Sequence, residues 1–181
     1  MLKITLPATE MWDESKEEFL YAKERTLQLE HSLVSLSRWE SKWNKAFLSN
    51  KEKTEEEIID YVRCMTITQN VPDDVYLRIT GSIIRQIYDY INAPMTATVI
   101  HNVGSSRGVQ RDVLTSEVIY YQMIALNIPF ECEKWHLNRL LTLIRVCDIK
   151  NTPPKKMNRR DIMNQNAALN AARRKSLNTK G

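Results

Sequence analysis

The chain has 181 residues, of which 43% are hydrophobic and 27% charged, and its formal net charge is +4. This size suits one domain, or one domain with an appendage, and the composition predicts a soluble protein with a buried core. The sequence has no apolar run of about 20 residues, no secretory signal pattern and four glycines, which argues against a membrane span, secretion and glycine-rich nucleotide loops.

Two short segments near the start of the chain alternate apolar and polar residues. LKITL has apolar side chains at positions 2, 4 and 6, and TLQLEHS has leucines at positions 27 and 29. Alternation with a period of two is typical of strands, so we predict two strands that pair with each other. The polar stretch between them, residues 8–25, is predicted to be a long connection.

Helical periodicity begins after these strands. Apolar side chains, including Trp39 and Trp43, recur at steps of three and four and predict a helix over residues 33–48. A second helix is predicted to begin at Thr54, because Glu57 three residues later completes the pattern of a capping box. The expected inward-facing residues of this second helix are Ile58, Val62 and Met65.

Prolines divide the next part of the chain. Pro72 favours the first turn of a short helix in PDDVYLRI, and a further helix is predicted between Gly81 and Pro94. The predicted buried stripe of this further helix consists of Ile84, Ile87 and Ile91. Residues 95–117 are interpreted as a β-hairpin, because two apolar-containing runs flank a polar loop with glycines at positions 104 and 108.

Two helices are predicted in the second half of the body. Thr115 or Ser116 caps the first, which ends before Pro129, and the second covers residues 132–150. One face of the second helix is expected to carry Leu137, Leu140, Leu141 and Ile144. Together these elements predict a mainly helical α+β fold, with a small N-terminal strand pair and a central β-hairpin.

The charge is concentrated at the end of the chain. From Lys150 onward there are nine Lys and Arg residues and one acid, Asp161, whereas the rest of the chain has 17 basic and 21 acidic residues. We therefore predict a globular domain over residues 1–150 and a basic tail over residues 151–181. Residues 158–177 have helix propensity but a thin apolar face, so this helix needs a partner or the body to be stable.

No set of residues predicts a catalytic or metal site. Cys132 and His136 are four residues apart, as two metal ligands on a helix can be, but no recognised spacing supplies the other ligands. GSSRG, residues 104–108, lacks the Lys-Ser/Thr ending of a phosphate loop. Paired acids such as Asp73 and Asp74 fall in polar positions where carboxylates stay solvated. We predict a protein that is not an enzyme and uses no cofactor or metal.

The basic tail is the strongest candidate for a binding site. Its candidate residues are Lys155, Lys156, Arg159, Arg160, Arg173, Arg174 and Lys175. Three alternatives stay open: a solvated helix or one bound to the acidic body, a site for another protein, and a site for nucleic acid. The absence of aromatic residues in the tail disfavours stacking on nucleic acid bases. The three cysteines are odd in number and scattered, which favours reduced thiols in a cytoplasm.

Three stretches carry a resemblance to a known family: LQLEHSLVSLSRWESKW, SEVIYYQMIALNIPFECEKWHLNRLLTLIRVC and NTPPKKMNRRDIMNQNAALNAARRKSLNTKG. They resemble the tail assembly chaperones of bacteriophages with long non-contractile, siphovirus-type tails, and the similarity extends from ITLP to the terminal TKG. The resemblance implies binding of the tape measure protein, a very long helical polypeptide, which is kept soluble while tail tube subunits assemble around it. It also implies a place in the host cytoplasm, absence from the mature virion and, in many members, a longer frameshifted product.

This role requires an apolar groove with polar surroundings, as in other proteins that bind amphipathic helices. Trp39, Trp43 and Trp135 are candidates for such a groove, although their helical spacing favours the core. The tail would then contact acidic faces of the client. A homo-oligomer is compatible with this role. The alternatives are a structural virion component, such as a connector or tail subunit, and a nucleic-acid-binding protein that uses residues 155–175.

Overall fold

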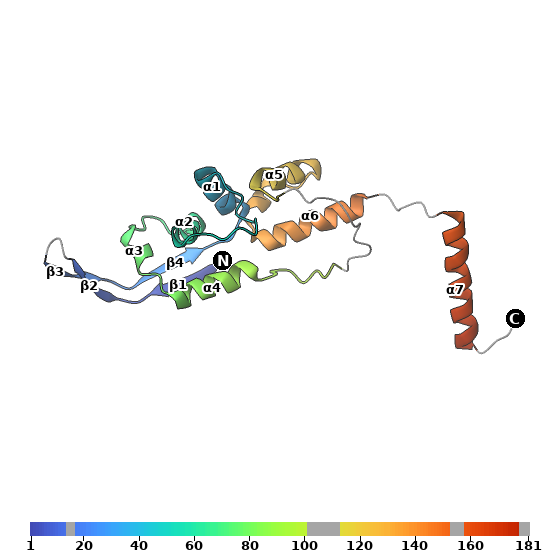
Figure 1. The fold of residues 1–181 in the computed structure, drawn as a ribbon, viewed down its shortest axis with the longest axis horizontal. Helices are drawn as coiled ribbons and strands as arrows, with labels where there is room; N and C mark the ends of the chain where they lie inside the picture. The colour runs from blue at the N-terminus through green and yellow to red at the C-terminus, as the bar shows by residue number, and fades with distance from the viewer. Residues whose placement is uncertain (14–16, 101–112, 153–157, 178–181) are drawn as a thin grey trace. The chain divides into compact units, whose positions relative to one another are not determined.

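The computed structural model describes residues 1–13, 17–100, 113–152 and 158–177 (Figure 1). The chain divides into two compact units, Met1–Asp148 and Ile149–Gly181. As predicted, the fold is a mainly helical α+β architecture, and its strands form two small antiparallel pairs. Among the described residues, no helix is both long and apolar enough to cross a bilayer.

The first strand pair is the predicted one. β1 (Leu2–Leu6) and β4 (Arg25–Leu29) are antiparallel, and Leu2 faces Leu29. Their alternation has the expected consequence, because one face of the pair is buried and the other is exposed. The buried residues of the two strands are Ile4, Leu6, Leu27 and Leu29.

The predicted long connection over residues 8–25 is wrong, because it contains a second strand pair. β2 (Thr9–Asp13) and β3 (Glu18–Ala22) are antiparallel and pair only with each other. Both pairs keep one register, so residues 7–8 and 23–24 interrupt a single two-stranded ribbon. Pro7 lacks the N–H that a ladder needs, and the Arg78 guanidinium donates to the carbonyl oxygens of Pro7 and Lys23 at the interruption.

The α-helices and one 3₁₀ helix account for most of the remaining chain. Their bounds are α1 (Leu33–Trp43), α2 (Glu55–Met65), α3 (Asp74–Leu77), α4 (Gly81–Asn92), α5 (Ser116–Ala125), η1 (Phe130–Lys134), α6 (Leu137–Asn151) and α7 (Arg159–Leu177). The predicted capping box of α2 is confirmed: Glu57 N donates to Thr54 Oγ1 over 3.3 Å, and Thr54 N donates to Glu57 Oε2 over 2.9 Å.

Several predicted helix limits are wrong for local reasons. α1 ends at Trp43 rather than at residue 48, because Asn44 adopts a left-handed conformation with φ of 52° that closes the helix. The helix predicted over residues 132–150 begins at Leu137, after η1. Of the predicted hairpin, residues 95–100 and 113–115 contain no strand, residues 116–117 belong to α5, and residues 101–112 lie outside the described residues.

The buried stripe of α4 also differs from the prediction. Ile83, Ile87 and Tyr90 are buried, whereas Ile84 and Ile91 are only half-buried. Both sets have helical spacing, so periodicity alone does not separate them. The packed face is rotated by one position, which leaves two isoleucines at the edge of the core.

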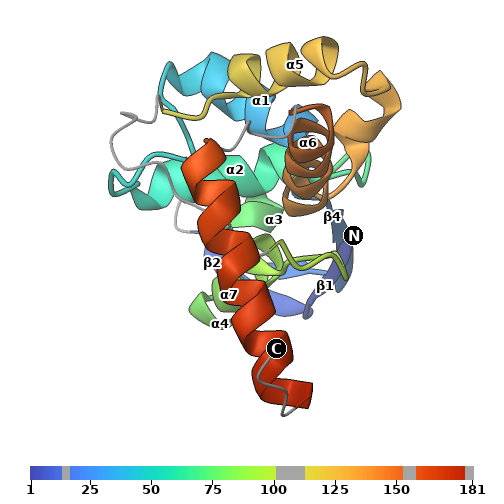
Figure 2. The same cartoon turned by 90° about the vertical axis from the view of Figure 1, so that its right-hand side faces the viewer.

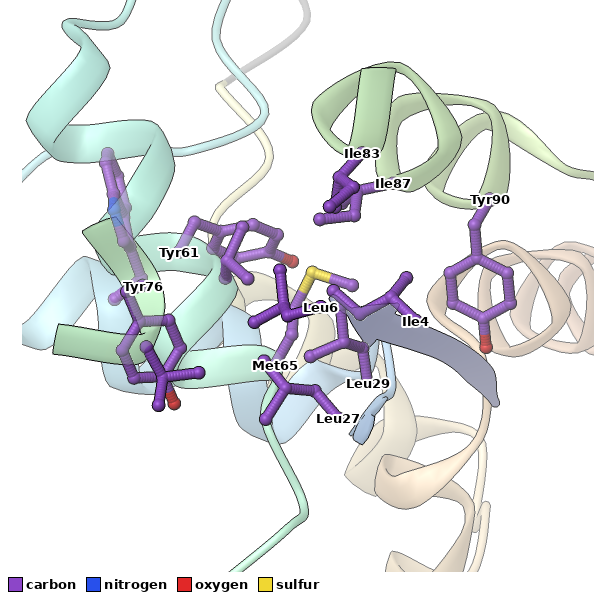
Figure 3. Packing of buried hydrophobic residues seen from close by; sticks show 13 residues of the cluster. Ile4, Leu6, Leu27, Leu29, Tyr61, Met65, Tyr76, Ile83, Ile87 and Tyr90 are labelled. Atoms are coloured by element: carbon purple, nitrogen blue, oxygen red, sulfur yellow. The ribbon is translucent and has the colours of Figure 1, made fainter. Parts of the chain in front are cut away.

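Two groups of buried apolar side chains form the core of the first unit. The first lies between the β1–β4 pair and helices α2, α3 and α4, and Figure 3 shows it from close by. The second joins α1, α5, η1 and α6, which lie together in Figure 2. Trp39 is buried in the first group, while Trp43 and Trp135 are half-buried against the first and second groups respectively.

A buried carboxylate connects α1 to two later segments. Glu40 Oε1 accepts the backbone N–H of Phe47 over 2.9 Å, and Glu40 Oε2 accepts that of Ser116 over 2.7 Å. The second bond places a negative charge at the N-terminus of α5, where the helix dipole favours it. Glu40 therefore fixes both the turn after α1 and the start of α5.

Two buried histidines contact each other and residues of the first core group. The rings of His31 and His136 have centroids 5.2 Å apart, and His31 Nδ1 lies 2.6 Å from the hydroxyl of Tyr61. His136 Nε2 lies 3.0 Å from the carbonyl oxygen of Tyr90, while Nδ1 lies 3.3 Å from the N–H of Asn138. The carbonyl accepts and the N–H donates, so the neutral Nε2–H tautomer satisfies both nitrogens of His136.

Burial makes this pair unfavourable for charge. Burial, with a smaller contribution from His136, lowers the pKa of His31 to about 3. Burial also lowers the pKa of His136 below its usual value. Protonation of His136 Nδ1 would place two donors against each other. Both histidines are therefore neutral in the folded chain near neutral pH.

Replacing Glu40 by Ala should lower the free energy of unfolding by about 3 kcal/mol, because two buried N–H groups lose their acceptor. Glu40→Gln, which keeps one acceptor, should lose less. Denaturant unfolding of the full chain measures both changes. Glu24→Ala, at an exposed position, is the control and should change stability by less than about 0.5 kcal/mol. Equal losses of stability at positions 40 and 24 would contradict the role of Glu40 in holding the turn after α1 and the start of α5.

The free energy of unfolding should also decrease as the pH falls below 6.5. Folded His31 stays neutral to about pH 3, whereas its ordinary pKa is 6.5, so the unfolded chain binds the additional proton in this window. The expected slope approaches about 1.4 kcal/mol per pH unit. Denaturant unfolding at several pH values above about 5, where most carboxylates are still ionised, measures it. His31→Gln should flatten the slope, and an unchanged slope would rule out His31 as its source.

Candidate protein-binding surfaces

The predicted basic residues fall at the two ends of α7. Arg159 and Arg160 lie in its first turn, and Arg173, Arg174 and Lys175 lie near its end. Lys155 and Lys156 are outside the described residues. The two groups are about 20 Å apart, given the rise of 1.5 Å per residue. The structure therefore brings the described candidates onto one helix, but as two separate clusters.

An exposed apolar row connects these clusters. Ile162 and Leu169 are seven residues apart and belong to one face of α7, with exposed fractions of 44% and 48%. Asn166 and Arg173 complete the row at helical spacing. Every side chain of α7 whose burial is described is exposed. An isolated helix of 19 residues with this composition is marginal in water, so a binding partner would stabilise it.

The structure also contains an apolar groove that the sequence analysis did not predict. It lies between α2 and α4 and has a cavity volume of about 170 Å³. Most of its wall is formed by Phe47, Ile58, Tyr61, Ile84, Tyr88 and Ile91. Ile84 and Ile91 are the residues that the prediction had placed in the core. Because these two residues lie outside the buried stripe of α4, they form one side of the groove.

Among the described residues that line this groove, the charged one is Lys53. Lys53 Nζ lies 4.9 Å from the ring centroid of Phe47, within the range of a cation–π contact. The Phe47 ring stacks on Tyr61 with centroids 3.7 Å apart, which fixes the floor of the groove. Hydrogen bonds from Lys45 and from the backbone of Thr54, in that order, hold the pKa of nearby Glu57 below its usual value. The groove thus offers apolar surface with one positive charge.

The residues considered for metal binding do not form a site. Cys132 lies in η1 and His136 precedes α6, so the two are not on one helix as the spacing had suggested. His136 uses both ring nitrogens in hydrogen bonds within the fold. Within the described ranges, no group of three or more His, Cys, Asp or Glu side chains is placed to hold a metal ion.

Sequence reasoning missed the groove because its parts come from three separate segments. Phe47 and Lys53 belong to the connection between α1 and α2, which has no regular pattern. The spacing of apolar residues in α4 does indicate two rows, one of Ile83, Ile87 and Tyr90 and one of Ile84, Ile87 and Ile91. That double row is the available signal of an amphipathic helix with more apolar surface than one core can cover.

Comparisons with protein-family models, curated proteins and solved structures find no match to this chain.

A small aromatic molecule should bind in the α2–α4 groove. An apolar cavity of about 150 Å³ is large enough for benzene, and this cavity has about 170 Å³. Indole added to the full chain should therefore raise the melting temperature, with a stabilisation that follows RT ln(1 + L/Kd), where L is the free indole concentration. Ile84→Trp fills the space and should abolish the increase, whereas Val113→Trp, at an exposed position, should retain it. The same increase in the Ile84→Trp variant would show that indole binds elsewhere.

Proposed function

We propose that this chain is a non-enzymatic tail assembly chaperone of a long-tailed bacteriophage, which binds helical segments of the tape measure protein. It would keep this client soluble in the cytoplasm of the infected host while tail tube subunits assemble, and would leave before the virion matures. The sequence resemblance supports the proposal, and α7 supplies the observation that carries it. This helix exposes an apolar row between two basic clusters.

The geometry of α7 defines the client that would fit. A helix that covers Ile162 and Leu169 must itself present apolar side chains at spacings of three and four residues. Because α7 has basic residues at both ends and no acidic side chain between Ile162 and Leu177, the matching client segment carries acidic residues beside its apolar row. A long tape measure helix would offer many such segments.

Repulsion between copies disfavours pairing of α7 with itself. Arg159 and Arg173 lie seven residues on either side of Asn166 and belong to the row that contains Ile162 and Leu169. In a parallel pair of α7 helices these arginines would face their own copies, and like charges at such positions are unfavourable. An acidic partner instead removes this repulsion, which favours a heterologous client over a second α7.

Two other functions are separated from this one by simple measurements. A structural virion component would be present in purified particles at a fixed copy number, whereas a chaperone would be absent. A nucleic-acid-binding protein would retain DNA or RNA with an affinity that falls steeply with salt. It would also lose that affinity on replacement of Arg173, Arg174 and Lys175 by Ala. The two exposed apolar side chains in the α7 row favour a protein partner over phosphate contacts.

Replacing Ile162 and Leu169 together by Gln should weaken capture of a tape measure fragment by at least about tenfold. Each replacement removes a half-exposed apolar side chain whose complete burial would contribute about 1–2 kcal/mol. Glutamine is a good helix former, so the helix itself is retained. Pull-down of the fragment with the full chain, followed by titration, measures the change.

The matched control replaces Ala167 and Ala171 by Gln. These positions are five and nine residues after Ile162, on the other side of the helix, and are exposed. The control should capture the fragment as well as the unmodified chain does. Equal losses in the two double variants, or equal capture of an unrelated helical protein, would contradict the proposal.

A further inference from the structure

A second unpartnered apolar surface lies on the β2–β3 hairpin. Trp12 faces Phe19 across the two strands, with ring centroids 4.9 Å apart, and Tyr21 faces Glu10. Directly opposed residues share a face, and so do residues two apart, which places all four side chains on one face. The exposed fractions of the three aromatic side chains are 52%, 69% and 65% in chain order. Exposed aromatic surface of this kind marks an interaction site.

Among the described residues, this hairpin belongs to no larger sheet. Its two strands pair only with each other, and a two-stranded hairpin alone is marginal in water. Figure 1 shows it at the end of the ribbon, beyond α3. Arg78 fixes the base of the hairpin through the carbonyl oxygens of Pro7 and Lys23. The hairpin is therefore held at its base while its aromatic face stays available to a partner.

The α2–α4 groove matches this face in size. A cavity of about 170 Å³ is filled by one benzene-sized ring, and Phe19 is the most exposed ring on the hairpin. The wall of the groove is apolar, since Ile58, Ile84 and Ile91 contribute to it. Within one chain Phe19 is exposed, so the hairpin does not enter the groove of its own copy.

The two surfaces also match in charge. Among the described residues, the hairpin face carries the charged side chain of Glu10 beside its aromatic side chains, and the lining of the groove carries that of Lys53 beside its apolar wall. A carboxylate and an ammonium at the edge of an apolar contact select the correct partner and its orientation. Both surfaces belong to the same polypeptide and are present at equal concentration.

We propose that the hairpin of one copy docks into the α2–α4 groove of a second copy, with Phe19 in the cavity and Glu10 next to Lys53. This contact joins two different surfaces, so each copy keeps one hairpin or one groove available. Such a contact produces a ring when the rotation closes and an open chain when it does not. It uses the first unit alone and is independent of the proposed role of α7.

The mass of the full chain in solution tests this contact. Sedimentation or light scattering should show mass that increases with concentration and continues beyond a dimer. Phe19→Ser should weaken this association by at least about tenfold, whereas Tyr121→Ser, at a 70% exposed aromatic on α5, should leave it unchanged. A monomer at all concentrations up to about 100 μM, or equal effects of the two changes, overturns the proposal.

A mixing experiment tests whether the contact joins two different surfaces. Phe19→Ser leaves the groove intact, and Tyr88→Glu, at a half-exposed position, changes the groove while leaving the hairpin intact. Each variant alone should be monomeric, and their mixture should form one-to-one dimers that grow no further. If the mixture stays monomeric, or if one variant alone still forms larger assemblies, the proposal is overturned.

Charge exchange provides a test that does not depend on the stability of the hairpin. Glu10→Lys and Lys53→Glu should each weaken association, because like charges then meet at the contact. The double variant restores opposite charges and should recover association to near the original strength. Failure of the double variant to recover, with both single variants weakened, overturns the proposed pairing of Glu10 with Lys53.

Discussion

The neutral histidine pair is the constraint that the first unit depends on most. His31 lies two residues after the end of β4, and its carbonyl oxygen accepts the N–H of Leu137 over 2.7 Å, so the start of α6 is fixed next to the start of α1. The His31 ring contacts Tyr61 in the first core group, and His136 binds the backbone of Tyr90 at the end of α4. Because a charge at either ring would be buried, this arrangement favours the neutral form of both histidines.

Local signals of the sequence predicted most of the elements that this constraint holds together. Two such signals are the capping box at Thr54 and the alternation of β1 and β4. Both depend on residues that are close together in the sequence, and both are present in the structure. The β2–β3 hairpin was missed because its aromatic side chains do not face a core, so alternation there marks no buried face. The hairpin could be predicted by extending the register of the β1–β4 pair along both strands. This extension is possible only once the pairing of β1 with β4 is known.

The candidate surfaces were predictable to different degrees for a physical reason. The charge of the tail is a property of composition, and composition is read directly from the sequence. Predicting that this charge forms two clusters requires only the positions of the basic residues and the rise per residue of a helix. The α2–α4 groove needs more, because it depends on which of two isoleucine rows of α4 is buried and on the path of the connection that carries Phe47 and Lys53. Tertiary packing decides which row is buried and which path the connection takes, and the apolar pattern of a single helix does not contain this information.

The three surfaces have consequences together that none has alone. The proposed contact would use one hairpin and one groove at every junction, and it involves no residue of α7. A chain of copies would therefore present several α7 helices to one long client, and linked weak sites bind more tightly than any single site. In the proposed chaperone role, each α7 contact could then be weak enough for tube subunits to displace it one at a time. A compact client with a single matching segment would gain nothing from this arrangement, so selectivity for a long repetitive helix would follow from the proposed assembly rather than from any one residue.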